Sequence, residues 1–362
     1  MSNYTILIVC EGENTEPLFF NSIRDQLIET KKTDNPSNIK LTIAPEPKVE
    51  EKIIDKIVKH KEKRKVRKTK SIPEIDKIEI IKGKPPLRWV QTAIRELKTG
   101  AFHEVWTVFD NDNHPAKEEA FKAAKELVNG KTIQIAYSSR SFEQYILTHF
   151  ERKYTPFVKT DCKYKIKKRS YLNRCGTNVF PDKDCNGNVC INGYASTKGF
   201  WKNTNEDNSK QNEMFSLIND KLEIGFENSS WIRYQSDLHE NETPLYNKNP
   251  YTDADLLIKK LLGYYKIHQW LKLDKMYTIK NISIYIDSKT KILTIKNISD
   301  TIVIIPNNIL IVYKGQTDLK IGDKTILDPE NRMSIRIDKY QDSETWFKIC
   351  HEEYILMFEN KA

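Results

Sequence analysis

Acidic side chains gather at two places, each directly after a short apolar run of the sequence. The first cluster holds Glu11, Glu13 and Glu16, and the second holds Asp110 and Asp112. Carboxylate oxygens suit Mg²⁺ and Mn²⁺, and several carboxylates brought together would repel one another without a cation. A divalent cation held there could orient a phosphate, stabilise its developing charge and activate water. The alternative is that these are solvated turn residues, which are common where strands end.

The apolar runs before the two clusters have the pattern of strands buried on both faces. They span residues 4–10 and 104–109, and similar runs span 39–44 and 132–137. Between them, helices are predicted from Thr15 onward and over residues 87–97, 115–128 and 141–150. This alternation predicts an α/β fold with a mainly parallel sheet and helices on both faces. Ligands collect outside the carboxyl ends of such strands, so both acidic clusters should lie at one edge.

The composition changes past residue 276, which indicates a second domain in this 362-residue chain. Seven short β-rich runs separated by turn residues predict a small all-β sandwich or barrel there. We therefore expect an α/β domain over residues 1–275 and an all-β, sandwich-like interaction domain over residues 276–362.

Composition also limits the class of protein. No window approaches the roughly 18 apolar residues of a membrane helix, and the first residues lack the pattern of a secretory signal. Six cysteines in so long a chain do not predict a disulfide framework. We expect a cytoplasmic protein with reduced thiols and no membrane partner. The net charge of +9 is compatible with a polyanionic partner.

Two insertions interrupt the α/β pattern and are rich in basic residues. In the first, residues 47–86, the stretch 52–70 has ten Lys or Arg residues against two acidic ones, a net charge of +8. We interpret this stretch as a helical nucleic-acid clamp, because lysines bind phosphates regardless of sequence; a solvated charged helix is the alternative. The nucleic-acid-binding candidates here are Lys61, Lys63, Arg64, Lys65, Arg67 and Lys68. In the second insertion, residues 155–205, they are Lys167, Lys168 and Arg169.

The second insertion also contains four cysteines and several aromatic residues. The cysteines are Cys162, Cys175, Cys185 and Cys190. Their spacing has no C-x2-C pair, so incidental reduced thiols are favoured over a structural Zn²⁺ site, which would rigidify the loop. The aromatic residues are Tyr164, Tyr171, Phe180 and Trp201. They could stack on single-stranded bases, although packing inside the protein is the favoured interpretation.

Four short blocks resemble the RloB family in their order and spacing. They are VCEGENTE at residues 9–16, VFDNDNH at 108–114, SSRSFE at 138–143 followed by LTHF at 147–150, and NPYTD at 249–253 before an apolar helix. The resemblance covers residues 4–265. It implies a Toprim-like domain related to the nuclease domains of OLD-type proteins. Members of the family are encoded beside ATPases in restriction and phage-defence loci.

The resemblance also implies roles for individual carboxylates. Glu11 matches the Toprim glutamate, a metal ligand or general acid/base, and Asp110 and Asp112 match the Asp-x-Asp metal pair. Glu16 matches the second glutamate of the first motif. Glu143, at a helix start, would be a further metal-site carboxylate facing the same edge.

Three other side chains near these motifs have chemistry to consider. His114 could contact the scissile phosphate or act as a general acid, or it could cap the helix that follows. Arg140 could hold a phosphate oxygen by a two-pronged contact. Arg140 and Ser141 stand where the family has Asn-Pro, so the loop can differ in shape. His149 lies on an apolar helical face and is interpreted as a packed histidine.

Together these features predict a Mg²⁺- or Mn²⁺-dependent endonuclease. It would act on RNA, tRNA included, or on DNA, as the effector of a bacterial antiviral, abortive-infection system controlled by a partner ATPase. One alternative is a non-catalytic nucleic-acid-binding or sensor subunit with a structural metal. Another is a Toprim-type phosphoryl-transfer enzyme that acts on small phosphates. The β domain has no cluster of catalytic residue types and is expected to dock to the ATPase or to a second copy, forming a homodimer.

Overall fold

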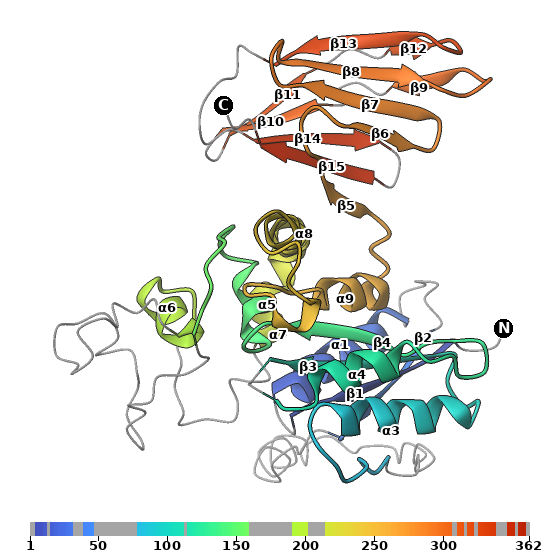
Figure 1. Ribbon diagram of the computed structural model, residues 1–362, viewed down its shortest axis with the longest axis vertical. Helices are drawn as coiled ribbons and strands as arrows, with labels where there is room; N and C mark the ends of the chain where they lie inside the picture. The colour runs from blue at the N-terminus through green and yellow to red at the C-terminus, as the bar shows by residue number, and fades with distance from the viewer. Residues whose placement is uncertain are drawn as a thin grey trace, which may run out of the picture. The chain divides into compact units, whose positions relative to one another are not determined.

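The chain folds into two compact units, Met1–Gly263 and Tyr264–Ala362 (Figure 1). The computed structural model describes residues 4–12, 15–31, 39–46, 78–111, 114–158, 190–201, 214–305, 310–314, 317–321, 325–337, 346–351 and 354–359. The sequence-based boundary at residue 276 falls inside the second unit. The first strand of that unit, β5 (Ile267–Trp270), pairs with its last strand, β15 (Tyr354–Glu359).

The first unit is built on a four-stranded parallel sheet. Its strands are β1 (Tyr4–Cys10), β2 (Ile39–Ala44), β3 (Glu104–Asp110) and β4 (Gln134–Ser138), in the order β2-β1-β3-β4. Cys10 is in register with Val108, and Asp110 with Ser138. The carboxyl ends of β1 and β3 therefore meet at one edge of the sheet, as the alternating pattern predicts.

Helices cover both faces of this sheet. The helices of the first unit are α1 (Thr15–Lys31), α3 (Leu87–Lys98), α4 (Lys117–Ala124), α5 (Glu143–Leu147), α6 (Ile191–Thr197), α7 (Met214–Ile218), α8 (Leu222–His239) and α9 (Ala254–Leu262), with short 3₁₀ turns η3 (Asn219–Lys221) and η4 (Leu245–Asn247). Those in contact with the strands are α1, α3, α4 and α9. Leu7 and Val9 of β1 share one apolar core with Trp89 of α3 and Ala120 of α4. The alternate residues of β1 are also fully buried and point to the other face, where α1 and α9 pack.

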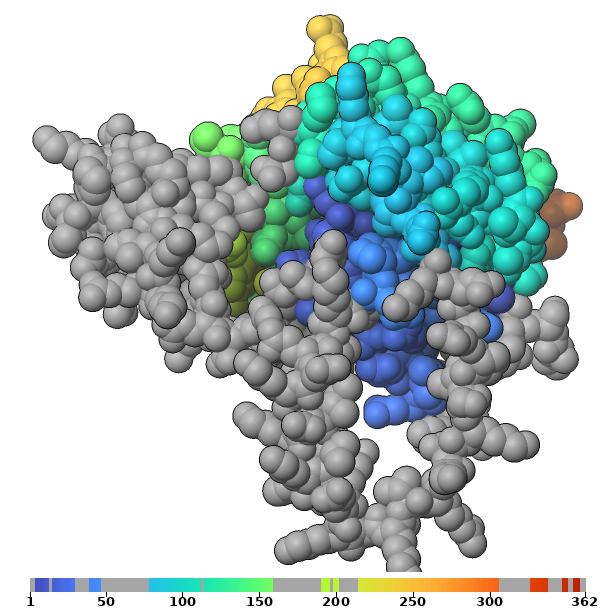
Figure 2. Space-filling view, turned by 90° about the horizontal axis from the view of Figure 1, so that it is seen from below, coloured from blue at the N-terminus to red at the C-terminus, as the bar shows by residue number. Residues whose placement is uncertain are grey.

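The two helix layers can be followed in the figures. Figure 1 shows α3 and α9 on opposite sides of the sheet. Figure 2 looks onto the α3 side, where the cyan surface of α3 adjoins the blue-green surface of the segment that includes α4. The expected α/β class with helices on both faces is confirmed. No helix among the described residues is long and apolar enough to cross a membrane.

The second unit is strand-rich and mainly antiparallel. Its further strands are β6 (Met276–Ile279), β7 (Ile282–Asp287), β8 (Ile292–Asn297), β9 (Val303–Ile305), β10 (Leu310–Lys314), β11 (Thr317–Ile321), β12 (Thr325–Leu327), β13 (Arg332–Arg336) and β14 (Trp346–His351). They form sheets of order β11-β10-β14-β15-β5 and β13-β8-β7-β6, with β12-β9 as a separate ribbon. Ile284 of β7, Phe347 of β14 and Phe358 of β15 are buried in one core. The expected sandwich-like β region is thus confirmed.

Candidate metal centre

Three potential metal ligands meet at the carboxyl edge of the parallel sheet. They are Glu11, Asp110 and His114, whose ligand atoms all lie within 4.8 Å of one another. Glu11 directly follows β1, and its backbone N–H donates to the carbonyl of Val108 at 2.9 Å, which continues the β1–β3 pairing by one residue. The sheet itself therefore brings Glu11 beside the last residue of β3. Among the described residues, this is the one group of three or more such side chains that converge.

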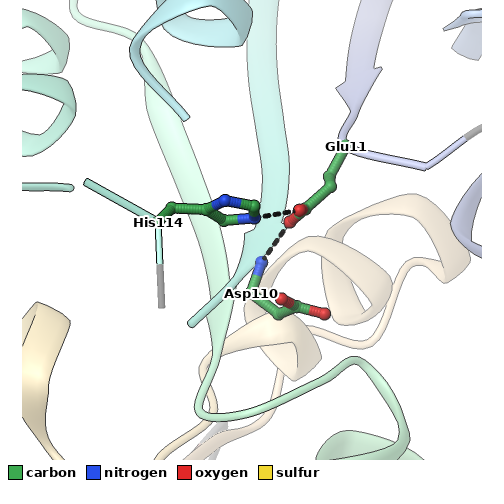
Figure 3. Close-up of side chains that lie close together, drawn as sticks. All are labelled: Glu11, Asp110 and His114. Atoms are coloured by element: carbon green, nitrogen blue, oxygen red, sulfur yellow. Dashed lines mark hydrogen bonds and ion pairs between the residues drawn. The ribbon is translucent and has the colours of Figure 1, made fainter. Parts of the chain in front are cut away.

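The Glu11 carboxylate connects the other two members of this group (Figure 3). Its Oε2 accepts a hydrogen bond from the backbone N–H of Asp110 at 2.9 Å, and its Oε1 contacts Nε2 of His114. The side chains of Glu11 and His114 are only 16% and 18% exposed. The His114 ring also packs edge-on against Trp89, with ring centroids 5.6 Å apart. These contacts fix the positions of the Glu11 and His114 side chains in a largely buried site.

His114 therefore lies in this group, where its ring could bind a cation as well as transfer a proton. The alternative that His114 caps the following helix is not supported, because the N-cap residue of α4 is Ala116. The sequence motif identified His114 as a candidate for catalysis but not as a ligand. Asp112, the second member of the Asp-x-Asp pair, lies outside the described residues, so its assignment stays a prediction.

Glu16 lies in the first turn of α1 and is 6% exposed. Burial, with smaller contributions from the negative charges of Glu11 and Glu143, raises its pKa to about 8. Glu143 begins α5, as the sequence predicted for a carboxylate at a helix start. A cluster of carboxylates that penalise each other's ionisation is an environment in which a cation would be stabilising.

Basic and amide side chains lie beside the acidic group, on the side of β4. Lys117, in the first turn of α4, donates from Nζ to Oδ1 of Asn111 and, at 3.3 Å, to Oδ1 of Asn247. Asn111 directly follows Asp110 and is 4% exposed. Burial and the nearby charge of Arg140 both lower the pKa of Lys117. Lys117 could not be predicted as a site residue from the sequence, because a single lysine at a helix start has no distinguishing pattern.

Arg140 has an unusual backbone conformation, with φ at 67°. Its Nε donates to the carbonyl of Phe157 at 3.0 Å. Ser141 then turns the chain back, with its backbone N–H bonded to the carbonyl of Ser139 at 2.9 Å. Arg140 and Ser141 stand where the family has Asn-Pro, and Arg140 adopts a left-handed backbone conformation. This conformation is uncommon for a residue with a side chain as large as arginine.

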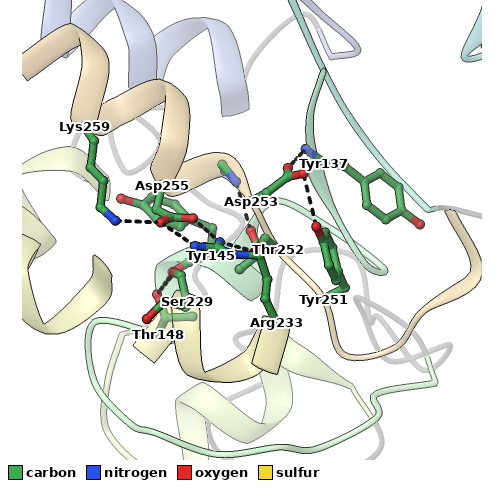
Figure 4. A network of polar contacts seen from close by, with 12 residues as sticks. Tyr137, Tyr145, Thr148, Ser229, Arg233, Tyr251, Thr252, Asp253, Asp255 and Lys259 are labelled. Carbon is green, nitrogen blue, oxygen red and sulfur yellow. Dashed lines mark hydrogen bonds and ion pairs between the residues drawn. The ribbon is translucent and has the colours of Figure 1, made fainter. Parts of the chain in front are cut away.

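The block at residues 249–253 lies along the outer edge of β4. Tyr251 and Ser139 exchange hydrogen bonds of 2.8 Å, and Ser138 pairs with Thr252 as an antiparallel bridge. Asp253 accepts a bond of 2.6 Å from the backbone N–H of Tyr137 (Figure 4). Burial raises the pKa of Asp253 to about 7. The block covers the free edge of the sheet, which would otherwise present unpaired backbone groups.

A buried ion-pair group anchors this edge to α8 and α9. Both oxygens of Asp255 bind the guanidinium of Arg233, at 3.0 Å for Oδ2, and Lys259 lies 3.2 Å from Oδ2. Nη1 of Arg233 also donates to the carbonyl of Thr252 at 2.8 Å. Although burial alone would raise the pKa of Asp255, the two cations hold it below its usual value. The sequence indicated the block but not this network.

His149 has a structural role, as its apolar helical face predicted. It is 1% exposed, and Nδ1 lies 3.2 Å from the carbonyls of Tyr145 and Ile146. Burial lowers its pKa to about 4, so the ring is neutral at pH 7. Gly225 of α8 packs directly against this ring. A Cβ at position 225 would lie 2.2 Å from Nε2 of His149.

Most of the predicted nucleic-acid and zinc residues fall outside the described residues. These are Lys61, Lys63, Arg64, Lys65, Arg67, Lys68, Lys167, Lys168, Arg169, Cys162, Cys175 and Cys185. Cys190 is described; it is buried and not in a disulfide. Trp201 is 8% exposed and its Nε1 donates to Asn192 at 3.2 Å, so this aromatic residue is packed rather than presented for base stacking.

The fold and the site together define a parallel α/β domain with a carboxylate–histidine cluster at the carboxyl edge of its sheet. Comparison with protein-family models matches residues 6–261 to the family described as RloB-like protein. The chain belongs to this family, as its four sequence blocks predicted. No significant match was found among curated proteins or among solved structures.

Proposed function

We propose that this protein is a Mg²⁺- or Mn²⁺-dependent nuclease that hydrolyses phosphodiester bonds of RNA or DNA. The observation that carries the proposal is the meeting of Glu11, Asp110 and His114, with ligand atoms within 4.8 Å of one another, at the carboxyl edge of a parallel sheet. This edge is where ligands bind in open α/β folds.

The donor set fits a divalent cation. Two carboxylates supply hard oxygen ligands, and an imidazole is accepted by Mn²⁺ more readily than by Mg²⁺. Three side chains fill only part of the coordination shell of either ion, which leaves room for water and substrate. A cation bound there would orient a phosphate oxygen, stabilise its negative charge and lower the pKa of water.

The chain's own groups have defined tasks in this proposal. Asp110 and Glu11 hold the cation, and Glu11 is itself oriented by the backbone N–H of Asp110. His114, in contact with Glu11 and packed on Trp89, is placed to hold a proton at Nε2 or to bind the cation. Glu16 is buried beside this group, which favours its neutral form, and a bound cation would favour its charged form.

We extend the proposal to an effector role in a bacterial antiviral system under the control of a partner ATPase. Membership of the RloB-like family supports this part, together with the resemblance described above. The basic stretch 52–70 would add sequence-independent affinity for the nucleic-acid backbone.

The proposal is tested with the purified full-length chain, plasmid DNA, tRNA and total RNA, in Mg²⁺, Mn²⁺ or EDTA. We expect metal-dependent cleavage that falls by about 10²-fold or more in Glu11→Gln and Asp110→Asn. Glu119→Gln is the matched control, because this carboxylate is exposed in α4 and is not in the converging group found among the described residues. It should cleave like the wild type.

Thermal melting with Mn²⁺ gives a second measurement that does not depend on cleavage. Mn²⁺ at 100 times its Kd should stabilise the wild type by about 2.7 kcal/mol and leave Glu11→Gln almost unchanged. Cleavage that survives both site substitutions would refute the site. Mn²⁺ stabilisation without cleavage of any substrate, even with the ATPase present, would favour the sensor alternative.

A further inference from the structure

Lys117 is held in an unusual way for a surface lysine. Its Nζ donates to two amide oxygens, Oδ1 of Asn111 and Oδ1 of Asn247, the second at 3.3 Å. Asn111 is buried and follows Asp110 without an intervening residue. The two amides therefore fix the ammonium beside the residue that ends β3, one position from a carboxylate of the candidate metal centre.

This ammonium has no carboxylate partner among the described residues, since its contacts there are the two amides. The next lysine of the same helix, Lys122, pairs in the ordinary way with Glu118 at 2.7 Å. The second cation near Lys117 is Arg140, whose charge together with burial disfavours the charged form of Lys117. Because burial and the charge of Arg140 disfavour the charged form of Lys117, an anion bound beside Lys117 would favour it.

The candidate site therefore combines groups of opposite charge. Carboxylates converge around Glu11, and the ammonium of Lys117 is bound by Asn111, the residue that follows Asp110. A phosphate ester in contact with a divalent cation carries non-bridging oxygens that need a second set of positive partners. A lysine ammonium has three N–H donors. Two of the donors of Lys117 bind the amide oxygens of Asn111 and Asn247, so the third could bind a phosphate oxygen.

We propose that Lys117 is a substrate-binding residue that contacts a non-bridging oxygen of the phosphate to be cleaved, held in place by Asn111 and Asn247. This inference rests on the proposed function, because it assigns the phosphate subsite of the same reaction. The competing explanation is that Lys117 only joins the end of β3 to η4 as a structural contact.

The test compares Lys117→Met and Lys117→Arg in the full-length chain, with Lys122→Met as the matched control. Lys122→Met removes the same charge from the same helix one turn and a half away, outside the site. Four quantities are measured: kcat and KM for cleavage, Mn²⁺ affinity, calorimetric affinity for inorganic phosphate in Mg²⁺, and the salt slope of oligonucleotide binding.

We expect Lys117→Met to lower kcat by roughly 10²- to 10³-fold and to weaken phosphate binding by about tenfold or more. The salt dependence of oligonucleotide binding should weaken by the amount that corresponds to about one phosphate contact. The Mn²⁺ affinity of Lys117→Met should stay within about twofold of the wild-type value. Lys117→Arg should recover phosphate binding and part of kcat, because it restores the charge. Lys122→Met should match the wild type in all four measurements.

Each outcome decides the matter. If Lys117→Met behaves like Lys122→Met, or if the wild type binds no phosphate, the inference is overturned. If Lys117→Met melts early and Lys117→Arg restores the melting temperature but not phosphate affinity, the lysine is only a structural contact. If the wild type binds phosphate through Lys117 yet cleaves nothing, the nuclease proposal fails and the phosphate subsite stands.

Discussion

Asp255→Asn should destabilise the first unit strongly, because it removes the carboxylate that pairs directly with two largely buried cations. Asp255 is 0% exposed, and the side chains of Arg233 and Lys259 are 18% and 9% exposed. Removing one partner of a buried ion pair leaves uncompensated charge and costs about 3–5 kcal/mol. For a unit of this size, that corresponds to a fall in melting temperature of roughly 6–20 °C.

Glu46→Gln provides the control for this prediction. Glu46 also pairs with a cation, Arg24, at 3.3 Å, but the two side chains are 55% and 26% exposed. An exposed pair contributes about 0.2–1 kcal/mol, so this variant should melt within about 4 °C of the wild type. Both variants are measured by thermal melting at pH 7 and by urea denaturation followed by tryptophan fluorescence. Equal shifts in the two variants would refute the view that the buried network anchors α8 and α9.

Two further predictions concern buried groups of the same unit. Gly225→Ala should lower the free energy of unfolding by about 1–3 kcal/mol, because its Cβ would meet Nε2 of His149 at 2.2 Å; a urea midpoint at or above that of the wild type would contradict this. The pKa of Asp253 is raised to about 7, so the fold favours its neutral form and loses stability as pH rises from about 4 through 7. Relative to Asp253→Asn, which cannot ionise, the wild type should lose up to about 4 kcal/mol over that window; melting curves whose difference is constant with pH would contradict this.

The parallel sheet could be predicted almost residue by residue from the sequence. Strands β1 and β2 have the expected limits, and β3 extends one residue further, to Asp110. Each is a continuous apolar run because both faces are covered by helices, and such runs are bounded sharply by polar residues. Glu11 and Asp110 could be assigned for the same reason, since a strand's end fixes the location of the residue that follows it.

Helix α8 was not predicted, although it has 18 residues. Its buried face includes Gly225, Asn228 and Ser229, which give no apolar period. These residues are buried because they fit against α5: Asn228 donates to the carbonyl of Thr148 at 2.7 Å, and Gly225 leaves space for His149. Contacts of this kind depend on a partner about 80 positions away and leave no local pattern.

The short strands of the second unit show a related limit. The seven β-rich runs all overlap strands, whereas β5, β6, β11 and β12 were not predicted. These four strands have three to five residues each, which is too few for a period of two to be distinguished. Strand β9 is as short, but it lies in the continuous apolar run Ile302–Ile305, which marked it as a strand. Lys117 was missed for a comparable reason, because its meaning depends on Asn247, 130 positions later in the chain.

The family match extends to residue 261, and the last part of the matched segment contacts the strands that carry the candidate site. Arg233 of α8 binds the carbonyl of Thr252, whose hydroxyl meets that of Ser138 at 2.8 Å. The carbonyl of Ser138 in turn accepts from the backbone N–H of Asn111 at 3.2 Å, next to Asp110. Without this chain of contacts, β4 would be an open edge and the loop after β3 would lose its support. The segment through α9 therefore belongs to the same structural unit as the candidate metal centre, although none of its described residues is in the converging group of Glu11, Asp110 and His114.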